Sequence, residues 1–102
     1  MSSAAELDPV IHAPLRLQVC ALLSATDEAE FALVREETGV SNSVLSKHVK
    51  QLEEAGYVRV RKATLASRQR TWLSLTKAGA RAFQAHVRAL TELAASTFKA
   101  PE

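Results

Sequence analysis

The residues with the clearest chemical potential are basic ones gathered in one stretch of the chain. Between Tyr57 and Trp72 the sequence has no acidic residue, and its basic residues there are Arg59, Arg61, Lys62, Arg68 and Arg70. A local field of one sign attracts a polyanion or an acidic surface. A solvated face with unrelated charges is the alternative interpretation, so the flanking segments must decide between the two.

The two halves of the chain carry opposite charge. Residues 1–40 hold two basic and seven acidic residues, a net charge of −5, and residues 41–102 hold eleven basic and four acidic ones, a net charge of +7. The formal net charge of +2 therefore hides a strongly basic second half. This asymmetry again favours an anionic partner.

Other chemistries find no support in the spacing of the residues. The histidines His12, His48 and His86 and the single cysteine, Cys20, match no metal-ligand motif, so we expect no metal site. The sequence has no evident nucleophile–base pair, glycine-rich phosphate loop or carboxylate pair, so we expect no enzyme, no catalytic residue and no cofactor. Cys20 falls on the apolar face of a predicted helix, which indicates a buried, inert thiol rather than a redox sensor.

Length and composition are typical of a small globular domain. The chain has 102 residues, of which 47% are hydrophobic and 24% charged, which predicts a single domain over 1–102 with a tail at 1–7. No apolar run approaches the roughly 20 residues of a membrane-spanning helix. A secretory signal is not evident in the first residues, and one cysteine allows no intramolecular disulfide. We therefore expect a cytoplasmic protein with no membrane partner.

The elements that position the basic stretch begin with two short helices. Apolar residues recur at helical spacing over 14–24, and Pro14 suits the first turn, where its missing N–H costs nothing. A short strand is expected near Phe31, followed by a helix over 32–38 that Gly39 ends.

A third helix is predicted over 42–55, with Ser41 as its N-cap. Its inward stripe is Leu45, Val49 and Leu52, at spacings of four and three. A tight turn joins it to the helix before it, so the two are expected to form a helix-turn-helix.

After Gly56 the pattern changes from helical to alternating. Apolar and polar residues alternate over 58–61 and again over 72–75, which predicts two half-buried antiparallel strands. Residues 62–70 are expected to form a polar loop with a basic tip, and no Asn-Gly turn sets its register. The predicted fold class is therefore mainly α with a small antiparallel β-hairpin.

The last predicted helix covers 76–98, with Thr76 as its N-cap, and carries a heptad-like apolar seam that Leu93 and Phe98 widen. This surface exceeds what the domain itself covers easily, so we expect a homodimer; folding back onto the same domain is the alternative. The residues expected at the dimer interface are Leu7, Val10, Ile11, Phe83, Val87, Leu90 and Ala94.

The chain resembles the winged helix-turn-helix transcriptional regulators of the MarR/ArsR type, in the stretches SNSVLSKHVKQLEEAGYVRV (41–60) and RTWLSLTKAG (70–79). The upstream stretches IHAPLRLQVCALLS and EFALVREETGV match the first helices of small stand-alone members. The resemblance implies a homodimeric regulator of transcription, more commonly a repressor, whose recognition helix enters the major groove of double-stranded DNA. A palindromic operator is implied as well, and a small-molecule effector stays open.

The expected DNA contacts lie on the outward face of the third helix and in the hairpin, or wing. They are Ser41, Asn42, Ser43, Val44, Ser46, Lys47, Lys50, Arg61, Lys62, Ser67, Arg68 and Arg70. Lys47 reaches either a guanine edge or a phosphate, and Val44 either touches a thymine methyl or packs half-buried. The wing cations contact the backbone or the minor groove. A winged helix module that binds proteins and not DNA is the alternative function, and the basic wing argues against it.

Overall fold

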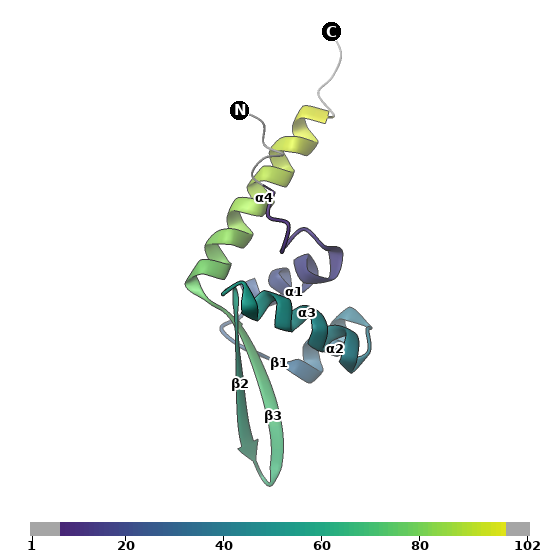
Figure 1. Ribbon diagram of the computed structural model, residues 1–102, viewed down its shortest axis with the longest axis vertical. Helices are drawn as coiled ribbons and strands as arrows, with labels where there is room; N and C mark the ends of the chain where they lie inside the picture. Colours follow the sequence, from purple (N-terminus) through teal and green to yellow (C-terminus); the bar gives the residue numbers. More distant parts are fainter. Residues whose placement is uncertain (1–6, 98–102) are drawn as a thin grey trace.

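Four helices and a three-stranded antiparallel sheet make up residues 7–97, the part of the chain that the computed structural model describes (Figure 1). In chain order the elements are α1 (Pro14–Ser24), β1 (Ala29–Glu30), α2 (Phe31–Thr38), α3 (Asn42–Glu54), β2 (Val58–Leu65), β3 (Arg68–Leu75) and α4 (Lys77–Thr97). The predicted fold class is confirmed. No helix within this range is both long and apolar enough to cross a membrane.

Helices α1, α2 and α3 enclose the apolar core. Leu23 of α1, Val34 of α2 and Leu45 and Leu52 of α3 are all buried, because each helix turns its apolar stripe inward. The strand expected near Phe31 lies at Ala29–Glu30, and α2 begins at Phe31, one residue earlier than predicted. That strand forms because it pairs with β3, a contact far away in the sequence.

The turn between α2 and α3 follows the local signals closely. Gly39 has a φ of 74°, the left-handed conformation in which its N–H donates to the Arg35 carbonyl and closes α2. Ser41 caps α3, because its Oγ accepts a hydrogen bond from the Val44 N–H at 3.2 Å. The N-cap predicted at Ser41 is thus confirmed.

The β2–β3 hairpin is longer than expected. The predicted polar loop over 62–70 is wrong, because both strands continue through it to the pair Leu65 and Arg68. A two-residue turn joins them at Ala66 and Ser67, which have φ values of 52° and 65°. Two positive φ angles match the right-handed twist of a hairpin. Pairing along the strands therefore overrides the absence of an Asn-Gly sequence.

A backbone junction joins the end of α3, the root of the hairpin and the start of α4. The Thr76 N–H donates to the Tyr57 carbonyl at 3.0 Å, and the Thr76 hydroxyl donates to the Gly56 carbonyl at 2.6 Å. The same hydroxyl accepts from the Gly79 N–H at 2.9 Å, which confirms Thr76 as the N-cap. Gly79 has no side chain, and a Cβ there would lie 2.0 Å from the Tyr57 carbonyl oxygen.

Helix α4 packs on α1 through its first half and then projects away from the body, opposite to the hairpin (Figure 1). Phe83 packs partly on the core, and His86 and Ala89 are buried, whereas every residue over 91–96 is exposed. Ile11, expected at the dimer interface, is fully buried in the domain's own core, so we remove it from that set. The prediction for Phe98 and most of the tail lies outside the described residues.

The junction yields a prediction about stability. Gly79→Ala should lower the free energy of unfolding by about 2–4 kcal/mol, because a backbone carbonyl blocks the new methyl group and the Thr76 cap is lost with any shift. Urea denaturation followed by circular dichroism measures the change. Ala78→Ser, at an exposed site in the same turn, should change it by less than about 0.5 kcal/mol. Equal stability of the two variants would contradict this account of the junction.

Candidate nucleic-acid interface

The outward face of α3 is exposed along its whole length. The α3 residues predicted to contact DNA, together with its N-cap, are all exposed: Ser41, Asn42, Ser43, Val44, Ser46, Lys47 and Lys50. Val44 leaves 42% of its surface open, which favours a surface contact over half-buried packing. Short hydroxyl side chains at the start of the helix allow its backbone N–H groups to approach an anion closely.

A groove separates α3 from the hairpin and brings their cations together. Ser46 and Lys50 line it from α3, and Lys62 and Thr71 line it from the sheet. The cavity measures about 310 Å³, and its apolar lining includes Phe31, Val49, Val60 and Leu73. One continuous surface therefore carries predicted contacts from both elements.

A second hollow lies at the edge of β3 beyond the end of β1. Asn42 at the start of α3 lines it together with Arg68 and Arg70 of β3, all three of them predicted contacts. Arg35 of α2 lines it too and was missed, since a single arginine in a mixed-charge helix has no distinctive spacing. The fold thus adds α2 to the elements that supply basic groups.

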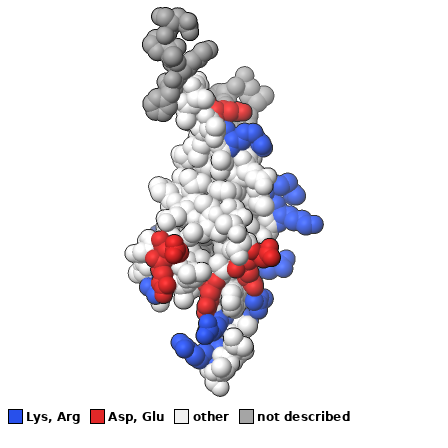
Figure 2. All heavy atoms as spheres, turned by 180° about the vertical axis from the view of Figure 1, so that it is seen from behind, with Lys and Arg blue, Asp and Glu red and all other residues white. Residues whose placement is uncertain are grey.

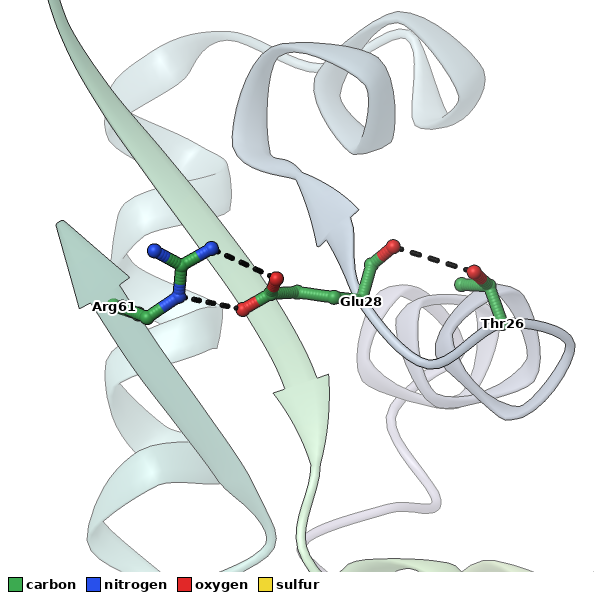
Figure 3. A network of polar contacts seen from close by, with 3 residues as sticks. All are labelled: Thr26, Glu28 and Arg61. Atoms are coloured by element: carbon green, nitrogen blue, oxygen red, sulfur yellow. Dashed lines mark hydrogen bonds and ion pairs between the residues drawn. The ribbon is translucent and has the colours of Figure 1, made fainter. Parts of the chain in front are cut away.

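The alternation of the strands turns Arg61 and Lys62 to opposite faces of the hairpin. Arg61 is opposite Trp72 in the register and lies with its guanidinium 5.7 Å from that ring, whereas Lys62 is opposite Thr71 and faces the groove. Glu28 reaches across β3 to bind Arg61 with both carboxylate oxygens, at 2.9 Å from Nε and 2.8 Å from Nη2 (Figure 3). The bond to Arg61 lowers the pKa of Glu28 and raises that of Arg61. Since Glu28 already occupies its guanidinium, the DNA contact predicted for Arg61 stays a prediction and does not enter the proposal below.

Arg70 also has a carboxylate partner, but in a weaker geometry. Its Nη1 donates to both oxygens of Glu30, at 3.0 and 3.2 Å. Its Nε is the one buried side-chain nitrogen or oxygen atom within residues 7–97 that has no hydrogen-bond partner. The guanidinium of Arg70 is therefore only partly satisfied by Glu30.

The surface seen from behind shows where the acidic and basic side chains lie. Acidic side chains gather on the body of the domain beside the hairpin root, and basic ones lie on the hairpin and along one edge above it (Figure 2). Acidic groups from the first part of the chain also lie directly beside cations of the second part, in the ion pairs of Glu28 with Arg61 and of Glu30 with Arg70.

The sequence of this chain matches a known protein family whose fold agrees with this arrangement of helix-turn-helix and hairpin. Residues 15–94 match the family described as the winged helix DNA-binding domain. The chain belongs to this family. It is a DNA-binding family and not an enzyme family, which agrees with the expectation for this chain. In its terms, α3 is the recognition helix and the β2–β3 hairpin is the wing.

Related proteins and structures agree with the fold. The chain is 27% identical over 84 residues to the uncharacterized protein MJ0432 of Methanocaldococcus jannaschii, covering 82% of this chain and 91% of that protein. The transcriptional regulator homologue of Pyrococcus horikoshii OT3 is 22% identical with a TM-score of 0.82, covering 87% of this chain and 88% of that one. The transcriptional repressor BigR of Xylella fastidiosa is 23% identical with a TM-score of 0.65, covering 96% and 88%.

A polar network that the sequence did not reveal holds the N-terminal segment against α4. Asp8 accepts a hydrogen bond from the Tyr57 hydroxyl at 2.6 Å, and its backbone N–H donates to His86 Nδ1 at 2.9 Å. The hydrogen bond that its hydroxyl donates to Asp8 raises the pKa of Tyr57. These partners lie up to 78 positions apart in the chain, so no local pattern predicts them.

Arg16 ties the same N-terminal segment to the recognition helix. Its Nε donates to the Val10 carbonyl, and its Nη1 donates to Gln51 and lies 3.0 Å from His48 Nδ1. Burial, followed by the charges of Arg16 and Lys47, lowers the pKa of His48. Recognition helix and N-terminal segment are therefore held in one fixed arrangement.

The surroundings of Cys20 and the histidines indicate structural roles. Burial, with a smaller effect of Asp8, raises the pKa of the Cys20 thiol from 9.0 to about 11, so the thiolate needed for reaction is scarce. His12 Nδ1 lies 3.3 Å from His86 Nε2. Within residues 7–97 no group of three His, Cys, Asp or Glu side chains is arranged to hold a metal ion.

His86 makes the stability of the winged helix domain depend on pH. Burial, and next the charge of His12, lowers its pKa against a smaller opposing effect of the Asp8 charge. Protonating Nδ1 would also break the hydrogen bond that it accepts from the Asp8 N–H. The unfolded chain takes up this proton near pH 6.5, before the folded one does. The free energy of unfolding should therefore fall as the pH drops below about 6.5, until the folded pKa is passed.

Urea denaturation between pH 7.5 and 5 measures this effect. His86→Gln should flatten the pH dependence. His48→Gln removes the other histidine with a lowered pKa, on α3, and should flatten the dependence less, because His48 is less buried than His86. If the slope with His86→Gln matched that of the native protein, the role assigned to His86 would be wrong.

Proposed function

We propose that this winged helix protein is a sequence-specific transcriptional regulator that binds double-stranded DNA as a homodimer. Ser46 and Lys50 of the recognition helix line the same groove as Lys62 of the wing, and this shared surface carries the proposal. The recognition helix enters the major groove, and the wing lies on the adjacent backbone or minor groove. A cytoplasmic location follows from this role. Repression and a palindromic operator stay predictions that rest on the family resemblance, and whether a small-molecule effector exists stays open.

The residues have different roles in this proposal. Lys47 projects from the exposed face of the recognition helix and reads a base edge, whereas Arg68 near the tip of the wing binds backbone phosphate. The remaining proposed contacts are Ser41, Asn42, Ser43, Val44, Ser46, Lys50, Lys62, Ser67 and Arg70. Val44 offers an apolar contact to a thymine methyl, and the other side chains of this set are short and polar or cationic, which suits close approach to phosphate.

The exposed part of α4 supports the homodimer. Val87 leaves 40% of its surface open, Leu90 is half-buried, and Ala94 is exposed beyond the point where α4 leaves α1. Apolar side chains on one side of a projecting helix stabilise a dimer when a second copy of the chain covers them. Leu7 and Val10, both half-buried, complete the proposed interface together with Phe83.

Titration of a fluorescein-labelled duplex of random sequence tests DNA binding. Affinity should fall by about 10³-fold or more between 50 and 200 mM salt, as about six phosphate contacts would require. Absence of binding even at low salt would instead favour a module that binds proteins.

A second experiment tests the assigned roles. With a DNA sequence selected from a random pool, Lys47→Ala should cost about 1–3 kcal/mol of binding free energy and relax specificity. Arg68→Ala should weaken all sequences equally, so equal effects of both variants on specificity would remove the assigned roles.

Light scattering at micromolar concentration tests the homodimer. Val87→Asp should shift the protein to a monomer and raise the dimer dissociation constant by about a hundredfold or more, since two copies of a buried charge enter the seam. Arg88→Asp places the same carboxylate one residue along α4, away from the seam, and should leave the mass unchanged. A monomeric mass for the native protein would refute the dimer.

A further inference from the structure

The hollow at the edge of β3 collects more positive charge than the fold neutralises. Arg35, Arg68 and Arg70 line it, together with the amides of Asn42 and Gln69, and Glu30 is its one acidic residue. Its volume is about 460 Å³. Like charges held around one hollow repel each other, and an anion placed between them relieves the repulsion. The side chains around the hollow are therefore complementary to an anion.

The two carboxylates beside β1 differ in how firmly they hold their arginines. Glu28 takes Arg61 in a two-pronged pair of parallel hydrogen bonds. Glu30 instead shares a single nitrogen of Arg70 between its two oxygens and leaves Nε without a partner. Two-pronged pairs are the stronger kind. Arg70 therefore exchanges Glu30 for another anion at a lower cost than Arg61 exchanges Glu28.

We propose that this hollow binds a backbone phosphate of DNA, with Arg35 of α2 as a contact beyond the recognition helix and the wing, and with Glu30 as a competitor for Arg70. The proposal rests on the DNA-binding function proposed above. Phosphate oxygens suit the planar donor edges of arginine. Since the hollow opens beside Asn42 at the start of the recognition helix, it borders the surface proposed for DNA.

The first test replaces Arg35 and follows the dependence of DNA affinity on salt. Arg35→Gln should lower the slope of log affinity against log salt by about 0.9 per protomer, a loss of about eightfold at 0.1 M salt. Random and selected sequences should lose equally. Arg88→Gln, which removes an exposed arginine of α4, should leave the slope unchanged. Arg35→Lys keeps the charge and should keep the slope, which separates charge loss from a folding defect.

The second test uses Glu28 and Glu30 as a matched pair. Glu30→Gln and Glu28→Gln remove the same charge from neighbouring positions, so a general electrostatic effect would strengthen DNA binding equally. The proposal requires Glu30→Gln to raise affinity by about threefold or more, and Glu28→Gln to change it by less than about twofold. Equal effects would overturn it, as would an unchanged slope with Arg35→Gln in a protein that binds DNA. No DNA binding by the native protein would instead overturn the proposed function.

A third measurement distinguishes DNA phosphate from free phosphate. Inorganic phosphate, added at constant ionic strength with chloride as the reference, should shift the NMR signal of Arg70 Nε weakly and without saturation at a few millimolar. The DNA duplex should shift it fully at stoichiometric ratio. Saturation by low millimolar phosphate, with DNA leaving the signal unchanged, would identify a free-phosphate site and overturn the proposal.

Discussion

The contact between Thr76 and the Gly56–Tyr57 backbone is the constraint on which the rest of the structure depends. Through one hydroxyl and one N–H, Thr76 closes the root of the wing, caps α4 and fixes the end of the recognition helix. Gly79 permits this because the Tyr57 carbonyl occupies the space of its missing side chain. The elements proposed to contact DNA and to form the dimer thus leave one junction in fixed directions, so the positions of the two recognition helices in the proposed dimer would follow from it.

The electrostatic organisation depends on the short strand β1. Its pairing with β3 places Glu28 and Glu30 beside the wing, where each meets an arginine that the sequence assigns to the basic stretch. The acidic first part of the chain therefore meets the basic second part in individual ion pairs. Hydrogen-bond geometry decides which wing arginine can leave its carboxylate for another anion. Arg61 stays in a two-pronged pair with Glu28, whereas Arg70, whose guanidinium is only partly satisfied, can exchange Glu30 for another partner.

Local signals predicted the helices well and the hairpin poorly. Pro14, Gly39 and Ser41 mark helix ends through backbone chemistry that acts within a few residues, and α1 has the predicted bounds. The wing was mistaken for a loop because its polar residues face solvent on both sides, and because strand pairing sets its Ala66–Ser67 turn. Ile11 was assigned to the dimer interface because apolar character alone does not tell which apolar partner covers a residue.

The sequence by itself determined the recognition helix with its outward face, and the concentration of positive charge after it. Periodicity and capping depend on neighbouring residues, and charge is additive. Tertiary structure decided which cations share a surface. It turned Lys62 toward the recognition helix and Arg61 away from it, added Arg35 from another helix, and supplied the carboxylate partners. Such choices arise from the two-residue alternation of paired strands and from contacts tens of residues apart, which no window of sequence contains.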